Sequence, residues 1–208
     1  SEMCIRDSMN MKKILVSAVT AILVGVSSMV APAVAHAGVV VNQGDRILVE
    51  NSPGNYTGCT VGYVHKGLRT LTTAGHCGGG RGLKVVDPHG NQIGTIGSNT
   101  YNRSTNENDV MVVNVNSNVG IGGNRFSGDG WAHPSRVRMG DPICSYGAKS
   151  GKTHCGIVTG VNGRVVSATR NAGGINGDSG GPAWVPGKGF VGIYTAYWKY
   201  QVDFTYPR

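Results

Sequence analysis

The chain has 208 residues, and its 34 glycines and 8 prolines make up about a fifth of it. Charged residues contribute only 14%, which excludes a helical bundle or coiled coil rich in Ala, Leu, Glu and Lys, and 39% hydrophobic residues argue against disorder. The formal net charge of +8 comes from lysines and arginines scattered singly, so it indicates a solvated surface and no nucleic-acid partner.

The N-terminal residues are expected to lie outside the folded protein. Residues 1–10 are expected to be a non-native or mis-started leader. Residues 11–37 combine a positive start, an apolar stretch and the small residues Ala35 and Ala37, which is the pattern of a secretory signal peptide cleaved after Ala37. A transmembrane anchor is the alternative, but the apolar stretch is short, contains hydroxyl residues and is followed by a cleavage site. We therefore expect a secreted, extracellular protein with no membrane association after cleavage.

The rest of the chain contains short β-branched or alternating runs separated by turn residues. These runs predict strands at 46–50, 56–65, 68–73, 83–86, 92–96, 110–115, 142–146, 156–161, 164–169, 182–185 and 190–197. A Gly- and Asn-rich stretch at 116–129 divides them. We expect two all-β units, residues 38–118 and 119–208, each a small antiparallel barrel or sandwich.

Four cysteines remain after signal cleavage, an even number suited to an oxidising compartment. They allow three connectivities, of which Cys59–Cys77 and Cys144–Cys155 close the shortest loops and are the pairing we expect. Zinc is the competing use of these cysteines, but no C-x-x-C or H-x-x-x-H spacing is present, so no metal or other cofactor is expected.

The segment with the clearest chemistry is residues 176–182, Asn-Gly-Asp-Ser-Gly-Gly-Pro. Glycines on both sides of Ser179 allow a tight turn that exposes its hydroxyl and aims the amides of Gly177 and Ser179 at one point. Two converging amides are what a developing oxyanion requires. The alternative is a glycine-rich hairpin turn with an incidental serine, which does not account for Asp178 and Pro182.

Two further segments supply a base and a carboxylate. His76, in Thr-Ala-Gly-His-Cys, is expected at a strand end beside a half-cystine, a setting that suits a general base. Asp109 precedes an apolar strand, where a partly buried carboxylate needs a hydrogen-bond donor such as a histidine N–H. The remaining histidines lack such a setting, and Asp129, Asp141 and Asp203 are not followed by a buried run.

Thr-Ala-Gly-His-Cys, Asn-Asp-Val-Met-Val and Gly-Asp-Ser-Gly-Gly-Pro, in that order, resemble the motifs of the chymotrypsin (trypsin-like) serine protease family. The short chain and its Cys144–Cys155 loop are most similar to the bacterial streptogrisin and alpha-lytic protease branch. The resemblance implies two six-stranded antiparallel β-barrels with the active site in the cleft between them. It implies a monomeric secreted endopeptidase that acts on polypeptides.

The resemblance also implies the roles of individual residues. Ser179 would be the nucleophile, His76 the general base and acid, and Asp109 the orienting carboxylate, with the amides of Gly177 and Ser179 as the oxyanion hole. Asp178 would form a structural ion pair, either with a freed N-terminal amine or with an arginine such as Arg136 or Arg138.

The primary substrate pocket departs from the trypsin pattern. Its residues would be Gly173, Gly174, Ile175, Thr195, Ala196 and Tyr197. Gly173 stands where trypsin has an aspartate, so specificity for Arg or Lys is not supported. Tyr197 would make the pocket shallow and favour small or medium apolar side chains.

Two alternatives to an active protease stay open. One is a non-catalytic binding protein, a pseudoprotease on the same fold. The other is an inactive fragment, because the chain ends soon after residue 197 and lacks the C-terminal helix usual in the family.

Overall fold

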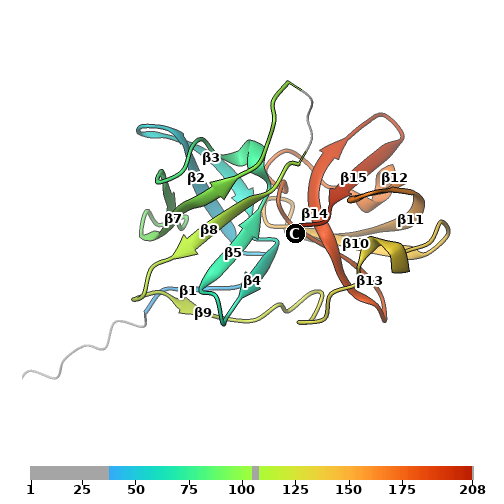
Figure 1. The fold of residues 1–208 in the computed structure, drawn as a ribbon, viewed down its shortest axis with the longest axis horizontal. Helices are drawn as coiled ribbons and strands as arrows, with labels where there is room; N and C mark the ends of the chain where they lie inside the picture. Colours follow the sequence, from blue (N-terminus) through green and yellow to red (C-terminus); the bar gives the residue numbers. More distant parts are fainter. Residues whose placement is uncertain (1–37, 105–107, 208) are drawn as a thin grey trace, which may run out of the picture. The chain divides into compact units, whose positions relative to one another are not determined.

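The computed structural model describes residues 38–104 and 108–207, and these form an all-β protein built on two sheets. Figure 1 shows the strands of the N-terminal half in blue to green and those of the C-terminal half in orange to red. The secretory signal and leader expected at residues 1–37 lie outside the described residues. None of the helices in the described ranges is long and apolar enough to cross a membrane.

The first sheet has seven antiparallel strands in the order β3-β2-β6-β7-β8-β5-β4. Its strands are β2 (Arg46–Ser52), β3 (Asn55–Thr60), β4 (Tyr63–His65), β5 (Thr70–Thr73), β6 (Lys84–Val86), β7 (Gln92–Asn99) and β8 (Met111–Val115). The two edge strands, β3 and β4, are separated along the chain only by Val61 and Gly62. Because two residues must span from one edge to the other, the sheet curls back on itself into a half-barrel.

The second sheet is a closed six-stranded barrel in the order β10-β11-β12-β15-β14-β13. Its strands are β10 (Pro142–Gly147), β11 (Lys152–Asn162), β12 (Val165–Thr169), β13 (Pro182–Val185), β14 (Gly189–Tyr197) and β15 (Gln201–Thr205). Closure pairs every strand on both sides, which leaves no sheet edge exposed.

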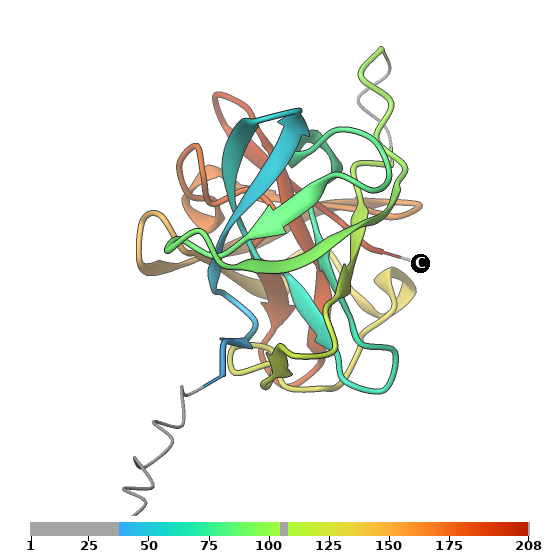
Figure 2. The same cartoon turned by 90° about the vertical axis from the view of Figure 1, so that its left-hand side faces the viewer.

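Several short elements lie outside the two large sheets. β1 (Val40–Val41) pairs in parallel with β9 (Gly120–Ile121), so the start of the described chain is joined to the connection between the sheets. Three single-turn 3-10 helices, η1 (Gly75–Cys77), η2 (Pro134–Arg136) and η3 (Arg170–Ala172), lie in the loops. Figure 2 views the first sheet from the front, with the red strands of the second barrel behind it.

The two sheets share buried side chains. Alternating residues of β2, such as Ile47 and Val49, and of the other strands fill the first core, as half-buried strands do. Phe190 and Ile193 belong to β14 of the second barrel but are fully buried in this first core. This shared burial sets the position of β14, and of the segments next to it, against the first sheet.

The all-β class and the chymotrypsin-like arrangement are confirmed, although the first sheet is a curled half-barrel and not a closed barrel. The strands of the two large sheets differ from the predicted ones in two main respects. The strand predicted at 56–65 is divided at Val61 and Gly62, whose amides bond to Asp45 and Thr72 rather than to a single partner strand. This division gives seven strands where six were expected. The second difference is β15, which was not among the predicted strands and completes the closed barrel.

Candidate active site

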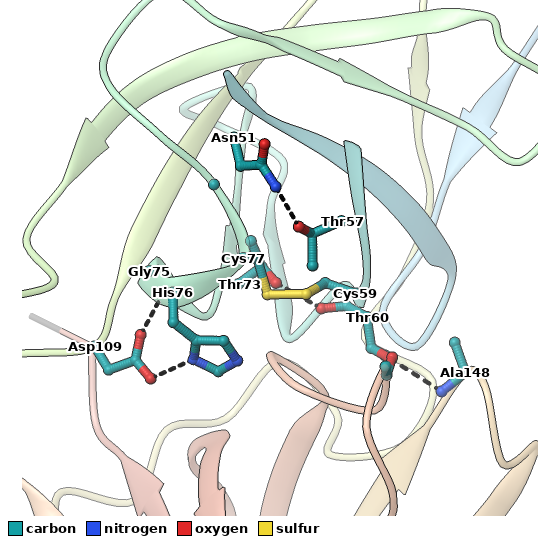
Figure 3. The surroundings of a disulfide bond; sticks show 12 residues. Asn51, Thr57, Cys59, Thr60, Thr73, Gly75, His76, Cys77, Asp109 and Ala148 are labelled. Atoms are coloured by element: carbon teal, nitrogen blue, oxygen red, sulfur yellow. Dashed lines mark hydrogen bonds and ion pairs between the residues drawn. A yellow bond between two sulfur atoms is a disulfide. The ribbon is translucent and has the colours of Figure 1, made fainter. Parts of the chain in front are cut away.

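His76 lies on η1, the turn that follows β5, and the neighbouring Cys77 is bonded to Cys59 of β3. Its imidazole Nδ1 lies 2.6 Å from Oδ2 of Asp109, and its backbone amide donates to Oδ1 of the same carboxylate at 2.7 Å. Figure 3 shows the ring turned towards Asp109 and the disulfide on the adjacent residue. The position of His76 is therefore fixed by a backbone hydrogen bond, by a ring hydrogen bond and by the disulfide of the next residue.

Asp109 is buried where the chain enters β8. Asn108 before it has a φ of +53°, a conformation that asparagine tolerates better than most residues, and this turns the chain sharply. A buried carboxylate is costly unless hydrogen-bonded, and His76 supplies two donors. An acceptor oxygen at Nδ1 assigns the proton to that nitrogen, which leaves Nε2 of a neutral imidazole free to act as a base.

Ser179 is half-buried in the turn before β13, and its carbonyl accepts a hydrogen bond from the Thr60 amide at 2.9 Å. The next residue, Gly180, is packed so closely that an added Cβ would lie 2.8 Å from the amide nitrogen of Ala74, two residues before His76. The turn that carries Ser179 thus rests directly on the segment that carries His76. Within the described residues the Ser179 hydroxyl makes no hydrogen bond with His76, and such bonds often tighten only when substrate binds.

The amides of Gly177 and Ser179 are available to an external acceptor. Those of Asp178 and Gly180 donate to the carbonyls of Ile175 and Tyr194, at 3.0 and 2.7 Å. In residues 38–104 and 108–207, no protein acceptor takes a hydrogen bond from Gly177 N or Ser179 N. The φ of +100° at Gly177 belongs to a region that L side chains rarely enter, so glycine is required there. Two unpaired amides on either side of one residue can stabilise an oxyanion.

Thr60 joins the two sheets behind this turn. Its hydroxyl donates to the Gly177 carbonyl and accepts from the Ala148 amide, each at 3.1 Å, and its own carbonyl accepts from the Thr73 hydroxyl at 2.8 Å. The bond to Ala148 is drawn in Figure 3. Thr60 was not predicted as a site residue, because nothing in its local sequence distinguishes it from other strand threonines.

The ion pair expected for Asp178 is not formed among the described residues. Its buried carboxylate instead accepts from the amides of Lys149, Ser150 and Ile175 at 3.0, 2.9 and 3.0 Å. Gly147 has no side chain to exclude the carboxylate from this loop. Three backbone donors satisfy the charge without a cationic side chain.

The glycines expected at the base of the primary pocket are buried against other side chains. A Cβ on Gly173 would meet Val202 and Tyr194, so this position is already filled. Burial raises the pKa of Tyr194 to about 12, and its hydroxyl donates to the Gly174 carbonyl at 3.5 Å.

The two expected walls of this pocket are bridged at their ends. The Tyr197 hydroxyl donates to the Asn176 side chain at 3.2 Å, while the neighbouring Ile175 is about half exposed. The guanidinium of Arg170 lies 4.9 Å from the Tyr197 ring centre and donates to the carbonyls of Gly173 and Gly174.

An open cavity of about 340 Å³ lies beside His76 and Asp109. It brings together part of the expected pocket with residues that the sequence did not single out. The expected lining residues are Thr195, Ala196 and Tyr197, and the additional ones are Tyr101, Val165, Trp198, Asp203 and Thr205. Gly173, Gly174 and Ile175 do not line it, so the expected pocket residues divide between two places.

The disulfides are Cys59–Cys77 and Cys144–Cys155, as expected. The second joins directly paired residues of β10 and β11. Cross-links of this kind are consistent with an oxidising, extracellular compartment. In the described ranges no group of three or more His, Cys, Asp or Glu residues is placed to hold a metal ion.

The sequence has a relative in Mycobacterium tuberculosis (strain ATCC 25618 / H37Rv), "uncharacterized protein Rv1815", with 30% identity over 156 residues, covering 67% of this chain and 68% of the relative. The chain belongs to the Rv1815 family. Protein MT1863 of Mycobacterium tuberculosis (strain CDC 1551 / Oshkosh) matches with the same identity and coverage. No protein-family model matches the sequence.

Among solved structures, the chain is similar to one described as "a glutamic acid specific serine protease" that "utilizes a novel histidine triad in substrate binding". The TM-score is 0.59 at 20% sequence identity, and the match covers 80% of this chain and 93% of the other. This likeness shows that this Rv1815-family chain has a serine protease fold.

Proposed function

We propose that the protein is a secreted serine endopeptidase in which His76, Asp109 and Ser179 form the catalytic triad. The observation that carries the proposal is the pair of hydrogen bonds from His76 to Asp109, one from the ring and one from the backbone. Together they orient a histidine whose free Nε2 faces away from the carboxylate. Beside it lies the turn that bears Ser179, in which the amides of Gly177 and Ser179 have no acceptor among the described residues.

The chemistry follows from these groups. Nε2 of His76 accepts the Ser179 proton as Oγ attacks the peptide carbonyl, and the amides of Gly177 and Ser179 stabilise the oxyanion. The imidazolium then donates its proton to the leaving amine, which produces an acyl-enzyme. Water, deprotonated by His76, releases the acyl group and restores Ser179.

Location and lineage are parts of the same proposal. Secretion is supported by the two disulfides and by the signal pattern in residues 11–37. We also predict that the protein is a monomer, that it acts on polypeptides and that it is related to the streptogrisin branch. The glutamic acid specificity named for the structural neighbour is not extended to this chain, because carboxylates line the cavity beside His76.

Proteolysis assays of the secreted protein test the proposal. The wild-type protein is expected to hydrolyse a fluorogenic peptide library, and Ser179→Ala is expected to lose about 10⁶-fold in kcat. Ser117→Ala is the matched control, since Ser117 is exposed in a turn, and it should retain full activity. Equal activity of Ser179→Ala and the wild type would refute the assignment of the nucleophile.

A further inference from the structure

The cavity beside His76 has a chemical character that the proposed function does not specify. Aromatic side chains of Tyr101, Tyr197 and Trp198 line it together with two carboxylates, Asp109 and Asp203. Asp109 is engaged by His76, so Asp203 is the carboxylate left to interact with a ligand.

Asp203 is held in place entirely by neutral donors. Its Oδ1 accepts from the Ser167 hydroxyl at 2.6 Å and from the side-chain amide of Gln201 at 2.9 Å. Its Oδ2 accepts from the Trp198 indole N–H at 2.8 Å. No lysine or arginine of the described chain lies within ion-pair distance of it. An ionised carboxylate offers about four acceptor sites, so three donors leave one for a further partner.

Access to Asp203 depends on the residue paired with it. Ala196 of β14 is directly opposite Asp203 of β15, and side chains of directly opposed residues lie on the same face of a sheet. The alanine methyl group covers little of that face, and both residues line the cavity. A larger side chain at position 196 would fill the space above the carboxylate.

We infer that this cavity binds a positively charged side chain, lysine or arginine, of the peptide substrate near the scissile bond, and that Asp203 selects it. The inference rests on the proposed function. The carboxylate supplies a charge-assisted hydrogen bond, and the aromatic rings supply faces that attract cations. This site differs from the filled position at Gly173, where a charged determinant is absent.

Arg170 is the group that favours the opposite choice. Its guanidinium contacts Tyr197, and an acidic substrate side chain near it would be attracted. Arg170 is not among the residues that line the cavity, so the charge facing the cavity is that of the carboxylates.

The test compares matched peptides that differ only in lysine, glutamine or glutamate at each position around the scissile bond. The wild-type enzyme is expected to favour lysine over glutamine at one position by about tenfold or more in kcat/KM, the scale of a hydrogen bond to a charged group. Asp203→Asn, which retains an acceptor oxygen, and Ala196→Leu, which fills the cavity, should each reduce this ratio to near one. Asp141→Asn, which removes a carboxylate paired with Lys188 outside the cavity, should leave the ratio intact.

Binding to Ser179→Ala separates this inference from the proposed function. Titration calorimetry on this variant measures affinity for the same peptides whether or not the wild-type protein cleaves them, and lysine is expected to bind about tenfold tighter than glutamine. Equal affinities, a preference for glutamate, or an unchanged ratio in both Asp203→Asn and Ala196→Leu would overturn the inference. Failure of cleavage with a preserved lysine preference in binding would refute the proposed function alone.

Discussion

The amide of Thr60 donates a hydrogen bond of 2.9 Å to the carbonyl of Ser179, which ties the first sheet to the turn that carries the candidate nucleophile. The Thr60 hydroxyl bonds at the same time to the Gly177 carbonyl and the Ala148 amide. One buried threonine therefore contacts both the turn and the loop beside it. The contact between the two sheets and the position of the candidate oxyanion amides are therefore tied to the same residue.

Replacing Thr60 with valine should impair catalysis as well as stability. The isosteric change removes both bonds of the hydroxyl, to the half-buried Gly177 carbonyl and Ala148 amide, at a cost of about 0.5–1.5 kcal/mol for each. Because one partner is the Gly177 carbonyl, kcat should fall by about tenfold or more as the oxyanion amides lose their orientation.

The control for this change is Thr57→Val in the same strand. The Thr57 hydroxyl bonds to Asn51 at the surface, away from the nucleophile turn. Urea unfolding and steady-state kinetics should show little effect of this control. A Thr60→Val protein with reduced stability but wild-type kcat would contradict a positioning role for Thr60.

Replacing Asp109 with asparagine should reduce kcat/KM by about 10⁴-fold with little change in fold. The asparagine amide presents an N–H towards Nδ1 of His76, which favours the tautomer with a protonated Nε2 that cannot accept the serine proton. Peptide hydrolysis at neutral pH measures the effect, and Asp141→Asn serves as the charge-matched control. Full activity of Asp109→Asn would mean that another group orients the base.

Gly180 and Gly187 offer a matched pair for testing how tightly the nucleophile turn is packed. Both have positive φ, +83° and +79°, so alanine meets a similar backbone penalty of about 1–2 kcal/mol at either. At Gly180 the new Cβ would also lie 2.6 Å from the Thr60 carbonyl oxygen, whereas at Gly187 nothing lies within 4 Å.

Gly180→Ala is therefore expected to be less stable than Gly187→Ala by about 1–3 kcal/mol and to lose most of its activity. The free energy of unfolding in urea, measured in parallel for both variants, gives the difference. Equal losses would show that the turn can move away from Thr60 at no cost.

Glu50 provides a prediction about pH. Hydrogen bonds from the backbone amides of Lys84 and Gly54 hold the pKa of its carboxyl below the ordinary value of 4.5. A carboxyl whose pKa is lowered by folding stabilises the protein above its unfolded pKa, and this contribution is lost as the pH falls through the folded value. Glu50→Gln should therefore unfold at lower urea concentration than wild type at pH 7, and the difference should shrink below pH 4.5. An identical difference at pH 7 and pH 3 would contradict this assignment.

Much of the architecture and the three candidate catalytic residues could be predicted from short motifs. Glycines on both sides of Ser179 allow a tight turn, and Cys77 next to His76 forms a disulfide. An apolar strand follows Asp109 and buries its carboxylate. Strand β15 was missed although Gln201–Thr205 alternates polar and apolar residues, because the run is short and ends close to the C-terminus. Thr60 and Asp203 could not be found in this way, because their roles depend on partners that are distant in the sequence. Thr60 bonds to Ser179, 119 residues later, and Asp203 bonds to Ser167, 36 residues earlier.

The pocket shows the same limit of local sequence. Tyr197 was expected to make the pocket at Gly173 shallow, and its hydroxyl donates to the Asn176 side chain at 3.2 Å. The space left open, however, is on the side of His76, because Val202 and Tyr194 fill the position at Gly173 and Ala196 is small. The location of the open cavity depends on how β14 and β15 pair, and the local sequence pattern does not determine this pairing.

The proposed function depends on Ser179 acting as a nucleophile activated by His76 and Asp109. Labelling of the folded, secreted protein with a fluorophosphonate, followed by peptide mapping by mass spectrometry, tests it most directly. We expect a single adduct on Ser179 that is absent in Ser179→Ala and forms far more slowly in Asp109→Asn. A folded protein that acquires no adduct, or acquires it at another residue, would contradict the assignment of Ser179 as the nucleophile.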